Sequence, residues 1–98
     1  MGVIHWIPPA GNGHSEQADR RPDMERVREF VDGTPETVYV LFKGKRAVMF
    51  VNGDGANIGM RVNPDASEIY AEYAKSKGQV CPCKIHGPAI ILEEISVD

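Results

Sequence analysis

Two neighbouring apolar runs constrain the fold of this chain more than any other feature of its sequence. Residues 37–42 and 47–51 are rich in β-branched and aromatic side chains, which is typical of strands. Residues 43–46, with the sequence Lys-Gly-Lys-Arg, have the length and composition of a hairpin turn. Because both runs are apolar at successive positions, they are predicted to be central strands of a covered sheet.

Three further strands are predicted outside this hairpin. Residues 3–7 and 89–95 are short apolar runs, and residues 56–62 alternate apolar with polar side chains as a half-buried strand does. Residues 79–84 give one more short extended piece, broken by Pro82.

Two helices are expected. Apolar residues at helical spacing predict a short helix within residues 22–31. A longer helix is predicted over residues 64–77, with Asn63 as its N-cap and Pro64 at its first position. This order of elements predicts an α+β fold, a small antiparallel or mixed sheet of four to five strands with both helices packed on one face.

The length and composition indicate one folded domain over residues 1–98. Apolar residues make up 42% of the chain and charged residues 26%, as in ordinary globular proteins. Residues 8–22 are polar, contain Gly and Pro and show no periodicity, which predicts a long loop. Such loops are often functional, so this one is expected to be mobile and part of the working surface.

The charge and the amino terminus point to a cytoplasmic protein. The formal net charge of −3 gives no strong nucleic-acid signal, since that normally requires a basic excess. Residues 1–7 are too short for a signal peptide, and no apolar run approaches the roughly 20 residues of a membrane helix. We therefore expect no membrane partner.

Four segments carry a family resemblance. They are residues 30–33 (FVDG), 48–55 (VMFVNGDG), 63–70 (NPDASEIY) and 85–92 (IHGPAIIL). In this order they resemble a family of small proteins of unknown function found mostly in phages, prophages and other mobile elements. The resemblance extends from Phe30 to Glu94, roughly two thirds of the chain. The longer polar loop after Pro8 and the Cys-Pro-Cys segment depart from the family pattern.

The resemblance implies a genomic setting and no active site. Small genes of mobile elements often encode inhibitors of host proteins. The leading expectation is therefore a non-catalytic interaction protein of a phage or mobile element, acting in the host cytoplasm. It is expected to inhibit a host protein or a host defence system, and no cofactor is expected.

An alternative function is a sponge that binds a nucleotide-like anionic small molecule. Basic side chains that could hold such an anion are grouped before the first helix and in the hairpin turn. The candidate binding residues are Arg20, Arg21, Lys43, Lys45 and Arg46.

A third and weaker hypothesis is a small zinc protein. Cys81, Cys83 and His86 provide three soft ligands within six residues, but Cys-x-Cys is tighter than the usual zinc spacing and a fourth ligand is missing. The glycines of residues 53–59 fit turns better than a phosphate loop. No nucleophile–base pair is visible in the sequence, so an enzyme is not expected.

The chain ends suggest a homodimer. Residues 3–7 and 89–92 carry no Lys, Arg, Asp or Glu, and an uncharged strand at a sheet edge invites pairing with its copy. The alternative is that the two terminal strands pair with each other inside one monomer. The expected core is Val40, Phe42, Val48, Phe50, Ile69, Tyr73 and Ile91, joined by Trp6.

Overall fold

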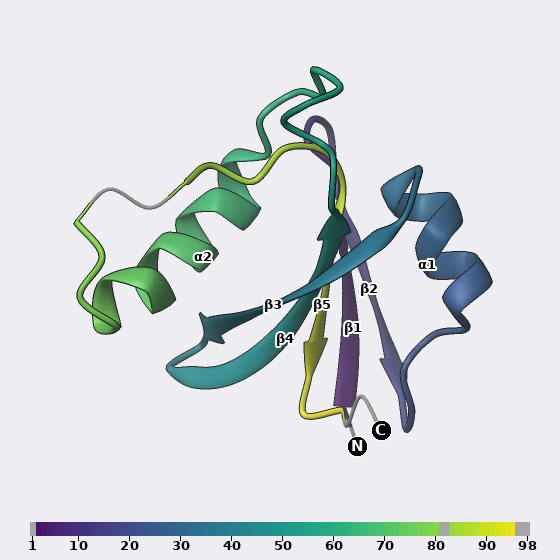
Figure 1. Ribbon diagram of the computed structural model, residues 1–98. Helices are drawn as coiled ribbons and strands as arrows, with labels where there is room; N and C mark the ends of the chain where they lie inside the picture. Colours follow the sequence, from purple (N-terminus) through teal and green to yellow (C-terminus); the bar gives the residue numbers. More distant parts are fainter. Residues whose placement is uncertain (1, 81–82, 96–98) are drawn as a thin grey trace.

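The computed structural model describes residues 2–80 and 83–95 and confirms the α+β class (Figure 1). A single five-stranded sheet has the strand order β2-β1-β5-β4-β3, and every neighbouring pair is antiparallel. The elements are β1 (Gly2–Ile7), β2 (His14–Ala18), α1 (Met24–Val31), β3 (Pro35–Phe42), β4 (Lys45–Asn52), α2 (Pro64–Ser76) and β5 (Ala89–Glu93).

The two terminal strands pair with each other in the middle of the sheet. The register of β1 and β5 runs from Val3 opposite Glu93 to Ile7 opposite Ala89. Each strand also has a second neighbour, β2 for β1 and β4 for β5. The expectation that one of them is an edge is therefore wrong, and the reason for a dimer through either strand is gone. Among the described residues, β2 and β3 each have a neighbouring strand on one side only, so they are the free edges of the sheet.

The two helices lie on opposite faces of the sheet, not on one face as expected (Figure 1). Successive residues of β4 and β5 are apolar, so both faces of the sheet need a cover. The α1 side buries Ile4, Trp6, Val27, Val31, Phe50, Ile90, Leu92 and Ile95. The α2 side buries Val40, Met49, Val51, Ala66, Ile85, Ala89 and Ile91.

Residues 8–22 are not one long loop, because they contain β2. This strand pairs with β1 from Gly2 opposite Ala18 to Trp6 opposite His14. An edge strand is paired on one side only, so the mostly polar sequence of β2 suits its exposed position. The indole N–H of Trp6 also donates to the Glu16 carboxylate at 2.8 Å. The segment is thus part of the sheet, and deleting it would remove a strand.

The strand predicted over residues 56–62 is also wrong. The chain coils there in successive turns, in which Ile58 N–H donates to Asp54 O at 3.0 Å and Met60 N–H to Gly55 O at 2.9 Å. Only Val62 forms a bridge, with His86. Alternation normally marks one buried face, but Ile58 is 61% exposed and packs on no core. The described part of residues 79–84 contains no strand either.

Asn63 holds this irregular region against the sheet. Its side chain is fully buried and its Oδ1 accepts the Ala66 N–H at 3.1 Å, which confirms the predicted N-cap of α2. Its Nδ2 donates to Ile7 O and Gly87 O, both at 3.0 Å. One amide therefore joins β1, α2 and the segment that leads into β5.

The expected core is confirmed at three of its positions, and at the other four the side chains are not fully buried. Val40, Phe50 and Ile91 are buried, and so is Trp6. The remaining four side chains are half-buried. Phe42 and Ile69 pack against the core on the α2 side, Val48 lines a hollow at the surface, and the fourth is Tyr73.

We predict that Phe50→Ala lowers the free energy of unfolding by about 3–5 kcal/mol. Phe50 is 4% exposed and fills the space between β4 and α1, so its removal leaves a cavity. Urea denaturation followed by circular dichroism measures the loss. A loss below about 1 kcal/mol would contradict the central position of this side chain.

Candidate functional site

The two free edges of the sheet differ in how they are protected. The edge strand β2 has five residues and carries Glu16, which forms an ion pair with Arg26 at 2.9 Å. Hydrogen bonds from Arg26 and Trp6 lower the pKa of the Glu16 carboxyl, so it stays charged. The edge strand β3 has eight residues, and its residues 37–42 (TVYVLF) carry no charge. Proteins usually shorten or charge their edge strands, so β3 is the exposed template for another strand.

The turn after β3 fixes which of its backbone groups face outward. Lys43 and Gly44, with φ of 53° and 78°, form a two-residue turn between the paired residues Phe42 and Lys45. Both central residues have positive φ, as a type I′ hairpin turn requires. In such a hairpin the flanking pair exchanges both backbone hydrogen bonds, and every second pair after it does the same. The even-numbered residues of β3 therefore bond inward to β4.

The other end of the hairpin agrees with this alternation. Gly53 N–H donates to Thr34 O at 3.1 Å, which continues the even-numbered series beyond the strand. The odd-numbered residues consequently direct both N–H and C=O away from β4, to the free edge. Those that retain an N–H are Thr37, Tyr39 and Leu41.

A shallow hollow lies beside this edge on the α1 side of the sheet. Its volume is about 350 Å³, and Tyr39 and Ile95 both contribute to its wall. The Tyr39 side chain is 46% exposed, and the Arg46 guanidinium lies 4.9 Å from the centre of its ring. The lining residues are Tyr39, Arg46, Ala47, Val48, Leu92, Glu94 and Ile95. The hollow could receive a side chain of a strand added at β3.

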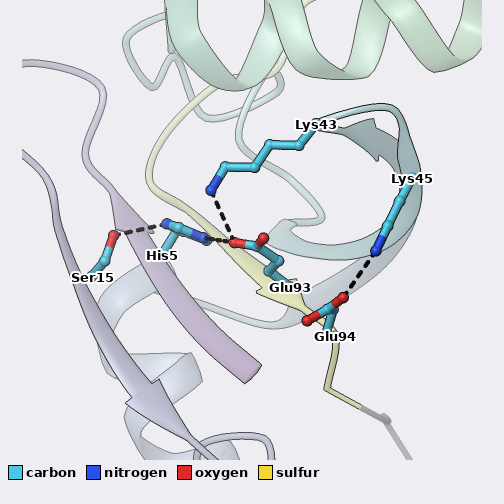
Figure 2. A network of polar contacts seen from close by, with 6 residues as sticks. All are labelled: His5, Ser15, Lys43, Lys45, Glu93 and Glu94. Carbon is cyan, nitrogen blue, oxygen red and sulfur yellow. Dashed lines mark hydrogen bonds and ion pairs between the residues drawn. The ribbon is translucent and has the colours of Figure 1, made fainter. Parts of the chain in front are cut away.

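A network of polar side chains lies at the end of the sheet where β5 stops (Figure 2). His5 is placed between Ser15 and Glu93, with distances of 2.7 Å from Nδ1 to Ser15 Oγ and 2.8 Å from Nε2 to Glu93 Oε1. An ionised carboxylate only accepts hydrogen bonds, so Nε2 carries a proton. In the neutral imidazole the Ser15 hydroxyl then donates to Nδ1. The network links β2, β1 and β5.

A serine, a histidine and a carboxylate in hydrogen-bond contact resemble the catalytic triad of a hydrolase, but the backbone around this serine differs from that of a catalytic nucleophile. Ser15 lies within the regular strand β2, paired with His5 of β1. In α/β-hydrolases, for example, the nucleophile stands at a sharp turn between a strand and a helix, beside backbone donors for the oxyanion. Here the His5 ring packs on Phe42, with centroids 4.7 Å apart. We assign the network a role in fastening the strands together.

The basic residues expected to form one anion site are not brought together. Lys43 Nζ lies 3.5 Å from Glu93, and Lys45 Nζ lies 3.0 Å from Glu94 (Figure 2). The hairpin that carries Lys43, Lys45 and Arg46 follows the edge strand β3. Arg20 and Arg21 follow β2, at the opposite edge of the sheet (Figure 1). The hairpin lysines thus already have carboxylate partners.

The residues of the zinc hypothesis are only partly described. Cys81 lies outside the described residues, Cys83 is exposed, and His86 Nδ1 donates to Met60 O at 2.9 Å. Within residues 2–80 and 83–95, no three His, Cys, Asp or Glu side chains are grouped to hold a metal ion.

Sequence reasoning missed the contact between His5 and Glu93. The two residues are 88 positions apart, and only the pairing of β1 with β5 brings them together. The uncharged run of β3 was visible in the sequence, but its place at an edge depends on the strand order.

Comparisons with known proteins leave the family resemblance a prediction. No family model, no curated protein and no solved structure matches this chain. Among the described residues, no helix is both long and apolar enough to cross a membrane.

We predict that Glu93→Gln lowers the melting temperature at pH 7 and that the difference from wild type disappears in acid. The hydrogen bond from His5 and the nearby Lys43 hold the pKa of Glu93 below its ordinary value of 4.5. A lowered folded-state pKa stabilises the fold above the unfolded-state pKa, and this contribution is lost as pH falls through the folded-state value. Thermal melts of both proteins from pH 7 to pH 3 measure the difference.

Glu94→Gln is the matched control for this experiment. Glu94 forms an ion pair with the exposed Lys45, and surface pairs of this kind contribute little. Its melting curve should follow wild type throughout. A Glu93→Gln difference that persists unchanged below pH 4 would show that the carboxylate charge is not its cause.

Proposed function

We propose that this chain is a small non-catalytic interaction protein of a phage or mobile element. It binds a host protein by taking one strand of that protein onto the free edge of β3, and it thereby inhibits the host protein or a host defence system. The observation that carries the proposal is the exposed, uncharged edge of residues 37–42. Edges of this kind are normally protected, and an unprotected one is a template on which a strand of another chain can pair.

Strand addition uses the backbone for affinity and side-chain pockets for specificity. The outward N–H and C=O groups of Thr37, Tyr39 and Leu41 supply the backbone part. The hollow beside Tyr39 and Ile95 supplies a place for one side chain of the added strand. Because α1 and α2 already cover the core on both faces, the edge can accept a strand without rearrangement of the fold.

The phage setting is supported by the four sequence segments that resemble the mobile-element family. Two of them contain the asparagines that organise the fold, Asn52 and Asn63. The anion-sponge alternative has less support, since Lys43 and Lys45 already face carboxylates and Arg20 and Arg21 lie at the other edge of the sheet.

We predict that Thr37→Pro abolishes partner binding and that Thr37→Ala preserves it. The Thr37 side chain is exposed, and its N–H points away from β4. Proline therefore removes a donor that only an added strand would use, and an edge strand tolerates it. The measurement is affinity capture from host lysate with quantitative mass spectrometry, followed by titration of the purified partner.

The two variants differ in the backbone donor, so their comparison separates strand addition from contact by the side chain. Circular dichroism melts should show both variants folded. Equal partner affinity of Thr37→Pro and wild type would contradict strand addition at β3. A nucleotide retained by the wild-type protein in native mass spectrometry, with no protein captured, would favour the sponge instead.

A further inference from the structure

We infer that the β3 edge of the free protein is occupied by a second copy of the same chain, with the two β3 strands antiparallel about a two-fold axis at Tyr39. The sheets of the two copies then join into one. A strand of a host protein would have to displace the second copy from the edge. This displacement is the one part of the inference that rests on the function proposed above.

Symmetry and the turn geometry together select the register. A two-fold axis perpendicular to the sheet keeps each residue on its own face, so residues opposite each other must share a face. Only outward-pointing residues can exchange hydrogen bonds across the new pair. Placing Tyr39 opposite Tyr39 of the second copy also sets Thr37 opposite Leu41. This register uses every outward N–H and C=O of the three residues, in about six hydrogen bonds.

The neighbouring registers leave groups unpaired. A shift toward the start of β3 sets Leu41 opposite Pro35, which has no N–H to donate to the Leu41 carbonyl. A shift toward the end sets Thr37 opposite Lys43, whose φ of 53° has already left the strand. The register centred on Tyr39 is the one in which every N–H and C=O of Thr37, Tyr39 and Leu41 is paired.

The charges at the ends of β3 suit the same arrangement. Glu36 lies near the start of the strand, and Lys43 follows its last residue. Antiparallel pairing brings the acidic start of one copy beside the basic end of the other. Opposite charges across neighbouring strands are favourable, and Lys43 would then lie between Glu93 of its own chain, 3.5 Å away, and Glu36 of the second copy.

The size of the contact makes the dimer weak and exchangeable. An interface one strand wide falls below the roughly 1,200–2,000 Å² of stable complexes. We therefore expect a dissociation constant on the order of 10⁻⁵ M. Self-pairing at this strength covers the edge at high concentration and still yields to a strand with a better fit.

Substitution of Tyr39 tests the axis directly. In the proposed register Tyr39→Lys places two lysines opposite each other, whereas the half-exposed side chain makes the substitution compatible with folding. In sedimentation velocity at about 100 μM, wild type should be mostly dimeric. Tyr39→Lys and Tyr39→Glu should each be monomeric, and an equimolar mixture of the two should dimerise again. Gln17→Lys, on the opposite edge strand β2, is the control and should dimerise like wild type.

Hydrogen exchange gives a second measurement on the wild-type protein. The N–H groups of Thr37, Tyr39 and Leu41 should become protected as concentration rises. Those of Val38 and Val40 bond to β4 and should be protected at every concentration. A wild-type mass of one chain at several hundred micromolar would overturn the inference, and so would a dimer that Tyr39→Lys leaves intact.

The outcomes separate this inference from the proposed function. A monomeric wild type that still loses its partner through Thr37→Pro would overturn the dimer and leave strand addition standing. A dimer centred on Tyr39, together with a partner whose binding Thr37→Pro does not affect or with no partner at all, would leave the dimer standing and overturn strand addition. If the dimer and strand addition are both observed, added partner should dissociate the dimer into single chains. A complex that contains the partner and both copies of the chain would show that partner and second copy do not compete for the edge.

Discussion

The pairing of β1 with β5 in the middle of the sheet is the constraint on which the remaining structure depends. It joins residues near the two ends of the chain, and it places Trp6 beside Ile90 on the α1 side and His5 beside Ile91 on the α2 side. With both strands interior, β2 extends the sheet on one side and the β4–β3 hairpin extends it on the other, which leaves β2 and β3 as the edges. The free-energy cost of closing so long a loop grows only logarithmically with its length. The distant pairing does raise the contact order, which slows folding.

Two buried asparagines fasten the irregular segments to this sheet. Asn52 Nδ2 donates to Val31 O at 3.1 Å and Asp32 O at 3.0 Å, and so holds the end of α1 against β4. Asn63 does the same for the start of α2 and the strand ends around it. In each case the loss of the side chain would leave buried carbonyls without a partner, which costs more than one hydrogen bond contributes. The turns of residues 53–62 can therefore remain polar and irregular, because both their ends are fixed.

The sequence predicted the β3–β4 hairpin and both helices well, but it missed β2, predicted a strand over residues 56–62 that does not form, and indicated the arrangement of the elements poorly. The β3–β4 hairpin and α2 were predictable because their signals are local, a Lys-Gly turn in one and the Asn63 cap with Pro64 in the other. Strand β2 was not, since its polar residues become a strand only when β1 offers an edge. The alternating pattern of residues 56–62 was misleading, because in the part of the chain that the structure describes no strand pairs with this segment. The placement of each helix on its face depends on the strand order, which no local pattern encodes. The candidate binding edge could not be predicted for the same reason. Residues 37–42 (TVYVLF) predict a strand in any topology, but this strand is an edge only because of the strand order.

The basic side chains that follow β3 are engaged by groups of their own chain, and this determines how the edge can recognise another strand. Lys43 extends to Glu93 and Lys45 to Glu94, while Arg46 lies over the Tyr39 ring. Charge that could repel an approaching strand is thus engaged by the chain's own side chains. What remains at the edge is the backbone of alternate residues, which any extended segment can pair with. Selectivity must then come from side chains that fit the hollow on one face, and from the acid-to-base polarity of the strand. A second copy has the complementary polarity by symmetry, but at the axis it only places its Tyr39 opposite Tyr39 of the first copy. A partner whose side chain also fills the hollow would bind more tightly at the same edge.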